Sequence, residues 1–273
     1  MARKSGKVYL IGAGPGDPQL LTLKAAKAMA TSDVIVYDYL VNPEVLVHAR
    51  QGVELIYVGK RAGNHSISQA EINDILIERA RRGEMVARVK GGDPFIFGRG
   101  GEEAEALAEA GIDWEVIPGI SSGVAAAAYA GIPLTHRGYS SSVSFITGHE
   151  SNKNGQAIDW SAAAHTADTL VVFMCAETIT SIARRLILAG RDPATPVAII
   201  RWGTYECQEV YSTNLDALRR MDEQSDEAAR IKIEPPAIAV IGSVVSLKEK
   251  LHWFGRPAIN IRQAESIEAL MEK

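Results

Sequence analysis

The sequence is poor in cysteine. Its two cysteines among 273 residues, Cys175 and Cys207, lie far apart and have no histidine or further cysteine at metal-ligand spacing. They indicate neither a zinc site nor a disulfide framework. We therefore expect no metal, and we expect both cysteines to be ordinary buried thiols.

The chain also lacks a surplus of cationic side chains. Its 29 Lys and Arg residues face 33 Asp and Glu residues, which gives a net charge of −4 and an isoelectric point near 5.9. Sequence-independent binding to nucleic acid depends on a surplus of Lys and Arg, so we expect no nucleic-acid partner. Any anionic ligand must be bound by local groups of cations.

No apolar stretch is long enough to span a membrane. The most apolar longer segment, residues 124–134, contains Gly131 and Pro133 and is far shorter than the roughly 20 residues of a spanning helix. The basic residues 1–7 are followed by only a short apolar run before a glycine turn, which is too short for a signal peptide. We expect a cytoplasmic protein with no membrane partner.

The chain is rich, in contrast, in short apolar runs that end at glycine and alternate with helical patterns. This alternation predicts two α/β domains, each with a mostly parallel or mixed sheet flanked by helices. The predicted domains are residues 1–138 and 139–256, followed by a C-terminal extension, residues 257–273. The expected strands are residues 8–11, 33–40, 53–58, 85–89, 114–117, 143–147, 169–174, 196–201, 206–212 and 237–241.

One glycine-rich run stands out at residues 91–102. It has five glycines within its first eleven residues and directly follows an expected strand. Glycine loses the most backbone freedom on ordering and adds no packing, so this run is a loop. Loops at the carboxyl ends of strands bind ligands in open α/β sheets, and we expect a ligand here.

A second glycine loop, residues 12–18, resembles a dinucleotide-binding fingerprint but departs from it. Asp17 stands where the third glycine belongs, and Pro15 removes an amide from the phosphate cradle. A charged aspartate repels a pyrophosphate. The loop therefore favours a ligand without phosphate and argues against a nicotinamide-dependent oxidoreductase.

Two polar residues at the ends of expected strands have more than one interpretation. Asp38 either binds a ribose hydroxyl, as in a Rossmann unit, or caps a turn. Lys60 is either functional or a solvated loop cation. Neither alternative is decided by the strand pattern.

Four motifs together resemble the uroporphyrinogen-III C-methyltransferases of the tetrapyrrole methylase superfamily, and the resemblance covers about residues 7–254. They are VYLIGAGPGDP at 8–18, GGDPFIFGRG at 91–100, PGISS at 118–122 and GIPLTHRG at 131–138. The first run is shared across the superfamily. The arginine-containing glycine loop and the Thr-His-Arg-Gly run are more specific to these enzymes.

The resemblance implies a homodimeric enzyme that binds S-adenosyl-L-methionine in a cleft between its two domains. It implies methylation of uroporphyrinogen III at C2 and C7, which gives precorrin-2 via precorrin-1 for sirohaem or cobalamin biosynthesis, with S-adenosyl-L-homocysteine as the second product. A later precorrin methyltransferase of the same superfamily and a non-catalytic S-adenosylmethionine-binding module remain as alternatives.

The same resemblance assigns roles to individual residues. Asp38 corresponds to the proton acceptor and Lys60 to the proton donor, and Arg99, Glu102 and Arg137 correspond to substrate-side positions. The cofactor-contacting positions are Pro15, Gly91, Gly92, Asp93, Ile96, Ser121, Ser122, Met174 and Gly203.

The residue types suit this chemistry. Uroporphyrinogen III carries eight carboxylates, and an arginine fork can bind a carboxylate through two hydrogen bonds while it keeps its charge. Methyl transfer to a pyrrole carbon depends on positioning and exclusion of water, so no nucleophilic Ser or Cys is required. The sequence departs from the family pattern at Cys175, where a glycine is usual, which puts the local backbone beside Met174 in question.

Overall fold

The computed structural model describes residues 6–59, 67–149, 158–223, 233–255 and 259–260. The chain divides into two compact units, residues 1–122 and 123–273, and each is described on its own. Among the described residues no helix is both long and apolar enough to cross a membrane.

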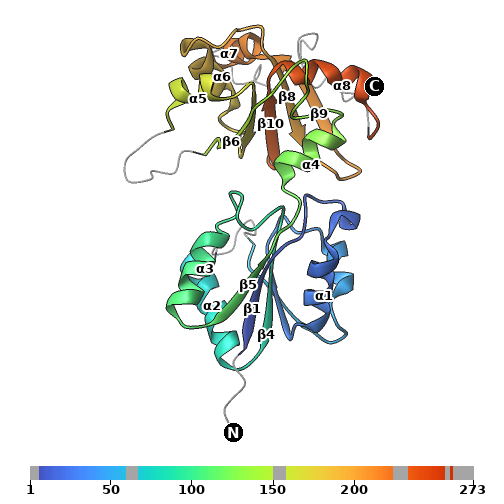
Figure 1. Cartoon of the computed structure of the whole chain (residues 1–273), viewed down its shortest axis with the longest axis vertical. Coiled ribbons are helices and arrows are strands. Elements are labelled where there is room, and N and C mark those ends of the chain that lie inside the picture. Colours follow the sequence, from blue (N-terminus) through green and yellow to red (C-terminus); the bar gives the residue numbers. More distant parts are fainter. Residues whose placement is uncertain (1–5, 60–66, 150–157, 224–232, 256–258, 261–273) are drawn as a thin grey trace. The chain divides into compact units, whose positions relative to one another are not determined.

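The first unit is built on five parallel strands in the order β3-β2-β4-β1-β5. Helix α1 lies on one face of this sheet, and α2 and α3 lie on the other (Figure 1). The elements are β1 (Lys7–Gly12), η1 (Pro18–Leu20), α1 (Leu23–Thr31), β2 (Val34–Tyr37), η2 (Pro43–His48), β3 (Glu54–Tyr57), α2 (Gln69–Arg81), β4 (Met85–Lys90), α3 (Gly100–Glu109) and β5 (Asp113–Ile117).

Local sequence explains where these elements begin and end. Helix α2 begins at a capping box in which Ser68 and Glu71 each bind the other's backbone N–H, and its last residues are followed by Gly83 with a φ of 91°. The central strands β1 and β4 alternate residues between two buried clusters, one under α2 and α3 and one under α1. Both faces of the sheet are therefore covered, as a parallel sheet requires.

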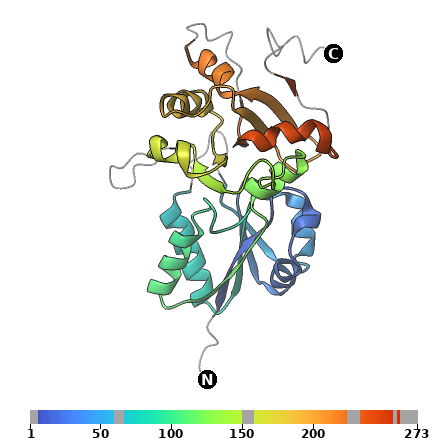
Figure 2. The ribbon, with the colours of Figure 1, turned by 45° about the horizontal axis from the view of Figure 1, so that its top comes forward.

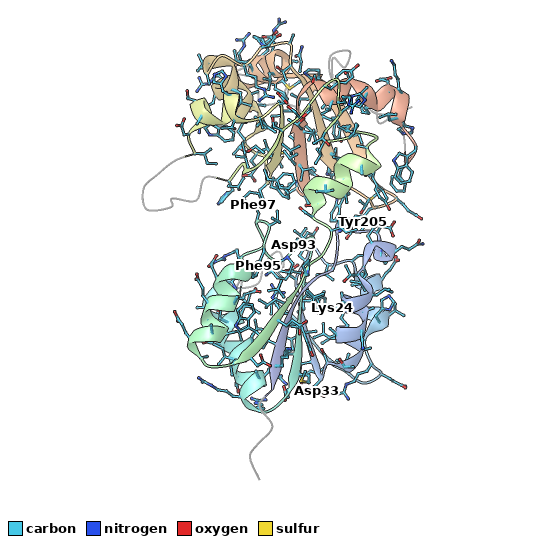
Figure 3. All side chains as sticks on the ribbon, in the orientation of Figure 1. Lys24, Asp33, Asp93, Phe95, Phe97 and Tyr205 are labelled. Carbon is cyan, nitrogen blue, oxygen red and sulfur yellow. The ribbon has the colours of Figure 1, made fainter. Side chains whose placement is uncertain are left out.

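Because all five strands run parallel, their carboxyl ends meet along one edge of the sheet, here called the carboxyl edge. The loops after β1, β2, β4 and β5 all reach it. Figure 3 labels Asp93 at this edge and Asp33 at the opposite end of the sheet. The two glycine loops identified in the sequence are thus brought together.

The second unit has a mixed sheet of six strands in the order β11-β9-β8-β10-β7-β6. Strand β10 runs antiparallel to both of its neighbours, whereas β6 runs parallel to β7. Helices α5, α6 and α7 cover one face, and α4 and η4 cover the other (Figure 2). The elements are α4 (Ser122–Tyr129), β6 (Val143–Thr147), α5 (Trp160–Thr166), β7 (Thr169–Phe173), α6 (Ile179–Leu188), β8 (Pro196–Arg201), β9 (Glu209–Asn214), α7 (Leu215–Glu223), β10 (Ala237–Ile241), η4 (Ser243–Leu247), α8 (Lys248–Leu251) and β11 (Ile259–Asn260).

These two sheets confirm the predicted fold class of paired α/β units. The division between the compact units follows Ser122, the first residue of α4, and the domain boundary expected after Gly138 stays a prediction. The small side chains of this segment explain why α4 groups with the second unit: Ala126 and Ala127 of α4, and Ala130 just after it, pack onto strands of the second sheet. Most of the predicted extension lies outside the described residues, although β11 pairs with β9.

The two cysteines differ in their surroundings. Cys175 is fully buried in the core of the second unit, where burial raises the pKa of its thiol to about 12. Cys207 is exposed, so the expectation that it is buried was wrong. It lies in the irregular segment between β8 and β9.

Candidate functional site

Three loops of the carboxyl edge join through glycine backbones, an arrangement here called the glycine junction (Gly12, Gly14, Gly92 and Gly119). Gly14 and Gly92 exchange hydrogen bonds, with N···O distances of 3.2 Å and 2.6 Å. A Cβ on Gly12 or Gly119 would press on the carbonyl oxygen of Gly92. Only glycine lets the loops after β1, β4 and β5 approach this closely.

Asp93 fastens the same loops through its side chain. Its Oδ2 accepts the backbone N–H of Gly119 at 3.1 Å, and its Oδ1 accepts the backbone N–H of Phe95 at 2.8 Å. The carboxylate therefore links the loop after β4 to the loop after β5. Sequence reasoning expected it to contact a cofactor, and that role stays a prediction.

The loop after β4 combines left-handed backbone angles with exposed apolar side chains. Phe97 and Arg99 have φ angles of 52° and 58°, in the left-handed region that residues other than glycine seldom adopt. Phe95, Ile96 and Phe97 are exposed despite being apolar. Figure 3 labels Phe95 and Phe97 in this loop. Such backbone strain concentrates at ligand-binding loops, because it must be maintained by the surrounding structure.

Arg99 and Glu102 bind each other at the start of α3. Two hydrogen bonds of 2.9 Å and 2.7 Å join the guanidinium to the carboxylate, and both side chains are more than half exposed. This pairing raises the pKa of Arg99 and lowers the pKa of Glu102. A carboxylate ligand would meet a cation that is already oriented by the protein.

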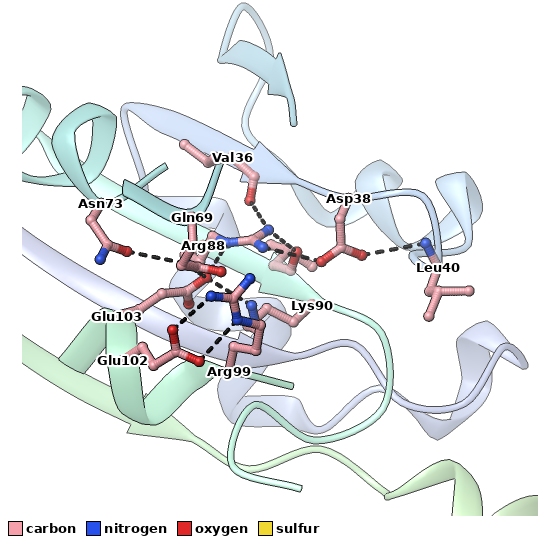
Figure 4. A network of polar contacts seen from close by, with 11 residues as sticks. Val36, Asp38, Leu40, Gln69, Asn73, Arg88, Lys90, Arg99, Glu102 and Glu103 are labelled. Carbon is pink, nitrogen blue, oxygen red and sulfur yellow. Dashed lines mark hydrogen bonds and ion pairs between the residues drawn. The ribbon is translucent and has the colours of Figure 1, made fainter. Parts of the chain in front are cut away.

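Asp38 belongs to an ion cluster with Arg88, Lys90 and Glu103 (Figure 4). Arg88 Nη2 donates to Asp38 Oδ2 at 3.1 Å, and Arg88 Nε donates to Glu103 Oε1 at 3.1 Å. Lys90 Nζ donates to the same Glu103 oxygen at 2.8 Å. This group of four residues is here called the buried ion cluster, since Arg88, Lys90 and Glu103 are each at most 4% exposed.

Burial lowers the pKa of Lys90, and the positive charge of Arg88 adds to this effect. Glu103 opposes it. Sequence reasoning missed Arg88, Lys90 and Glu103 because it treated β4 as an apolar run. The signal was present, since two cations at a spacing of two residues share one face of a strand.

Met174 and Gly203 lie in the second unit, in the loops after β7 and β8. Met174 has a φ of 52° and is half exposed, and the two neighbours of Gly203, Trp202 and Thr204, have φ angles of 48° and 73°. A Cβ on Gly203 would collide with the Cβ of Ala126 in α4. These loops thus share the strained backbone of the loop after β4.

The remaining predicted site residues fall as follows. Pro15 lies in the loop after β1, Ser121 and Ser122 follow β5, and Arg137 is exposed in the second unit. Among the described residues the buried Ser121 Oγ has no hydrogen-bond partner. Lys60 lies outside the described residues.

The structure therefore brings together the predicted residues of the first unit and leaves the others on a second set of loops. The carboxyl edge gathers Pro15, Asp38, Gly91, Gly92, Asp93, Ile96, Arg99, Glu102, Ser121 and Ser122. Met174, Gly203 and Arg137 belong to the second unit.

Comparison with known proteins defines the class. Residues 7–219 match the profile of the tetrapyrrole (corrin/porphyrin) methylases, and the chain belongs to this family. It is 50% identical over 249 residues to the uroporphyrinogen-III C-methyltransferase of Bacillus subtilis, a match that covers 91% of this chain and 95% of that protein.

Two further relatives extend the comparison. The siroheme synthase of Blochmanniella pennsylvanica is 47% identical over 264 residues, which cover 97% of this chain but only 54% of that longer protein. The crystal structure of uroporphyrin-III C-methyltransferase from Thermus thermophilus, complexed with S-adenosylhomocysteine, matches with a TM-score of 0.75 and 37% identity. That match covers 89% of this chain and all of the other.

Proposed function

We propose that this protein transfers methyl groups from S-adenosyl-L-methionine to C2 and C7 of uroporphyrinogen III, giving precorrin-2 via precorrin-1. The observation that carries the proposal is the glycine junction at the carboxyl edge, in a chain of the tetrapyrrole methylase family. The product serves sirohaem or cobalamin biosynthesis. The chain spans only about half of the siroheme synthase that it matches, so the proposal concerns methylation alone.

The residues of the edge fit this cofactor. It is a cationic sulfonium with an amino-acid end and an adenosine, and it has no phosphate. The glycine junction has no side chains that would block a ligand. Ser121 Oγ, which has no hydrogen-bond partner among the described residues, offers a hydroxyl. Asp17 caps η1 by accepting the Gln19 N–H at 2.8 Å, which places a carboxylate where a phosphate-binding loop would need a glycine.

Bound S-adenosylmethionine supplies an electrophilic methyl group and leaves as S-adenosylhomocysteine. The protein contributes positioning, because an in-line displacement needs the acceptor carbon aligned with the methyl group and shielded from water. We assign cofactor binding to Pro15, Gly91, Gly92, Asp93, Ile96, Ser121, Ser122, Met174 and Gly203. Asp93 acts by fixing the loops that carry the others.

The substrate brings eight carboxylates to a protein of net charge −4, so it requires local cations. Arg99 is held by Glu102 in a fixed direction and presents its remaining N–H groups to a propionate or acetate side chain. Arg137 is exposed in the loop before β6 and supplies a second cation. Methylation makes a substituted pyrrole carbon quaternary and leaves the ring with a positive charge, so the ring must lose a proton from another position. We assign Asp38 as the acceptor of that proton and Lys60 as the proton donor.

One experiment tests the function against its alternatives. The protein is incubated with S-adenosylmethionine and freshly generated uroporphyrinogen III, and the oxidised product is identified by absorbance and mass. Addition of two methyl groups supports the proposal. Binding of S-adenosylhomocysteine without turnover would indicate a non-catalytic module, and methylation of a later precorrin only would indicate another enzyme of the family. Homodimerisation is tested by light scattering, and the cytoplasmic location by cell fractionation.

A further inference from the structure

The Asp38 carboxylate is held from two sides. Its Oδ2 accepts a hydrogen bond from Arg88 Nη2 at 3.1 Å, and its Oδ1 accepts the backbone N–H of Leu40 at 3.3 Å. The side chain of Asp38 is 26% exposed, whereas that of Arg88 is 3% exposed. An accessible carboxylate at the carboxyl edge is thus bound to a cation in the interior.

Arg88 itself has little freedom to move. Its Nε donates to Glu103 Oε1, and its Nη1 donates to the backbone carbonyl of Val89 at 3.1 Å and approaches that of Val36 at 3.5 Å. The planar guanidinium therefore has acceptors on several of its edges (Figure 4). Its remaining direction, toward Asp38, is fixed by these contacts.

The charges of the buried ion cluster explain why Arg88 can serve Asp38. Glu103 is fully buried and its Oε1 accepts from both Lys90 and Arg88, while Gln69 Nε2 adds a neutral hydrogen bond at 3.3 Å. Lys90 alone is enough to neutralise Glu103. The charge of Arg88 is then balanced by the Asp38 carboxylate.

We propose that Arg88, held by Glu103, is a positioning residue that fixes the Asp38 carboxylate for proton removal during methyl transfer. The inference rests on the proposed function of Asp38. Asp38 supplies the second negative charge that Arg88 and Lys90 together require, because Glu103 balances only one of these cations. The contact from the interior to an accessible carboxylate is what points to a role in turnover.

A double-mutant cycle separates positioning from general support of the fold. Arg88→Met is made in the natural chain and in the Asp38→Asn variant, and kcat is measured for both. We expect Arg88→Met to lower kcat about tenfold or more in the natural chain, and by less than about twofold when Asp38 is already replaced. The Kd for S-adenosylhomocysteine, measured by calorimetry, stays within about twofold throughout.

Two further variants keep the test decisive. Arg88→Lys retains the charge without the fork and should recover part of kcat, and it carries the cycle if Arg88→Met does not fold. Lys90→Met removes the other buried cation, which donates a hydrogen bond to Glu103 and not to Asp38. This variant should lower the midpoint of thermal unfolding and change kcat little.

The outcomes are distinct. Equal losses of kcat from Arg88→Met in both backgrounds would overturn positioning while leaving the methyltransferase proposal intact. An unchanged kcat in Asp38→Asn alone would remove Asp38 from the mechanism, and the inference about Arg88 with it, although methylation itself would still be observed.

Discussion

Arg99 and Glu102 face each other across the first turn of α3, with Nε 2.9 Å from Oε1 and Nη2 2.7 Å from Oε2. The arginine backbone is left-handed at this position, with a φ of 58°. An acidic side chain of the same helix thus orients the cation assigned to the substrate. A substrate carboxylate can bind the N–H groups that Glu102 leaves unused, so the pair can act without separating.

Arg99→Ala should weaken binding of the tetrapyrrole and spare the cofactor. We expect the KM for uroporphyrinogen III to rise about tenfold, the effect of losing one charge-assisted contact. The Kd for S-adenosylhomocysteine should change by less than about twofold. Arg82→Ala is the matched control, because Arg82 also pairs with a glutamate of its own helix, Glu78, but lies at the end of α2 away from the glycine loops. Equal losses of both affinities in Arg99→Ala would contradict the division between cofactor loop and substrate cation.

The glycine junction predicts a strong effect of a single methyl group. Gly119→Ala places a Cβ against the Gly92 carbonyl oxygen and the Gly12 backbone, so the loops must move apart. We expect a loss of about 1–3 kcal/mol in the free energy of unfolding, together with weaker binding of S-adenosylhomocysteine. Gly101→Ala is the control, since a Cβ there meets nothing within 4 Å and alanine favours the helix. Calorimetric titration and urea unfolding of the two variants check this, and unchanged cofactor affinity in Gly119→Ala would remove the junction from the binding site.

The sequence alone predicted the succession of strands and helices along the chain, and the loops proposed to contact ligands. Glycine after an apolar run marks the end of a strand, and the parallel order of the first sheet then places residues 12–18 and 91–99 at one edge. The resemblance to a family added the residues within those loops. It could not reveal that Asp93 binds two backbone N–H groups, because these contacts depend on the folded loop.

The buried ion cluster lay beyond the sequence for a different reason. Hydrophobic periodicity counts apolar positions, so it predicts an apolar strand over residues 85–89 and gives no role to Arg88 or Lys90. Their partner Glu103 belongs to the following helix and comes next to them only when α3 packs on β4. The departure at Cys175 is now explained, since the left-handed residue is Met174 and Cys175 directs its side chain into the core.

The hydrogen bonds of the Gln208 side chain lead to a further prediction about cofactor binding. Its side chain is buried, accepts the Thr204 N–H at 2.8 Å and donates to the Tyr129 carbonyl at 3.3 Å, and so ties the loop of Gly203 to α4. Gln208→Leu leaves both backbone groups without this partner, at a cost of about 1–3 kcal/mol. We expect the Kd for S-adenosylhomocysteine to rise by about tenfold, and the KM for uroporphyrinogen III to change less.

A neighbouring substitution serves as the control for Gln208. Thr213 lies in β9, and its buried hydroxyl has no hydrogen-bond partner within the described part of the chain. Thr213→Val should therefore leave cofactor affinity unchanged. If Gln208→Leu lowers only the unfolding temperature and the two variants bind S-adenosylhomocysteine equally, the hydrogen bonds of Gln208 do not position the loop.

Glu115 predicts how the stability of the first unit depends on pH. Hydrogen bonds from Lys24, at 2.5 Å, and from Lys7, at 2.8 Å, lower the pKa of this carboxyl from 4.5 to about 2. A carboxyl whose pKa is lower in the folded state adds stability above its unfolded pKa and loses that stability as the pH falls toward its folded pKa. Because Glu115 is partly exposed, we expect a contribution of about 1 kcal/mol rather than the full value of the shift.

Glu115→Gln removes this contribution. Its free energy of unfolding should be about 1 kcal/mol below that of the natural chain at pH 7, and the difference should shrink as the pH falls from about 4.5 toward 2. Lys24→Gln removes one of the two cations and should give part of the same effect, because Lys7 still binds the carboxylate. Urea unfolding at pH 7 and at about pH 3 measures both variants. A difference that stays constant over this range would mean that the lysines stabilise β5 through packing and not through the charge of Glu115.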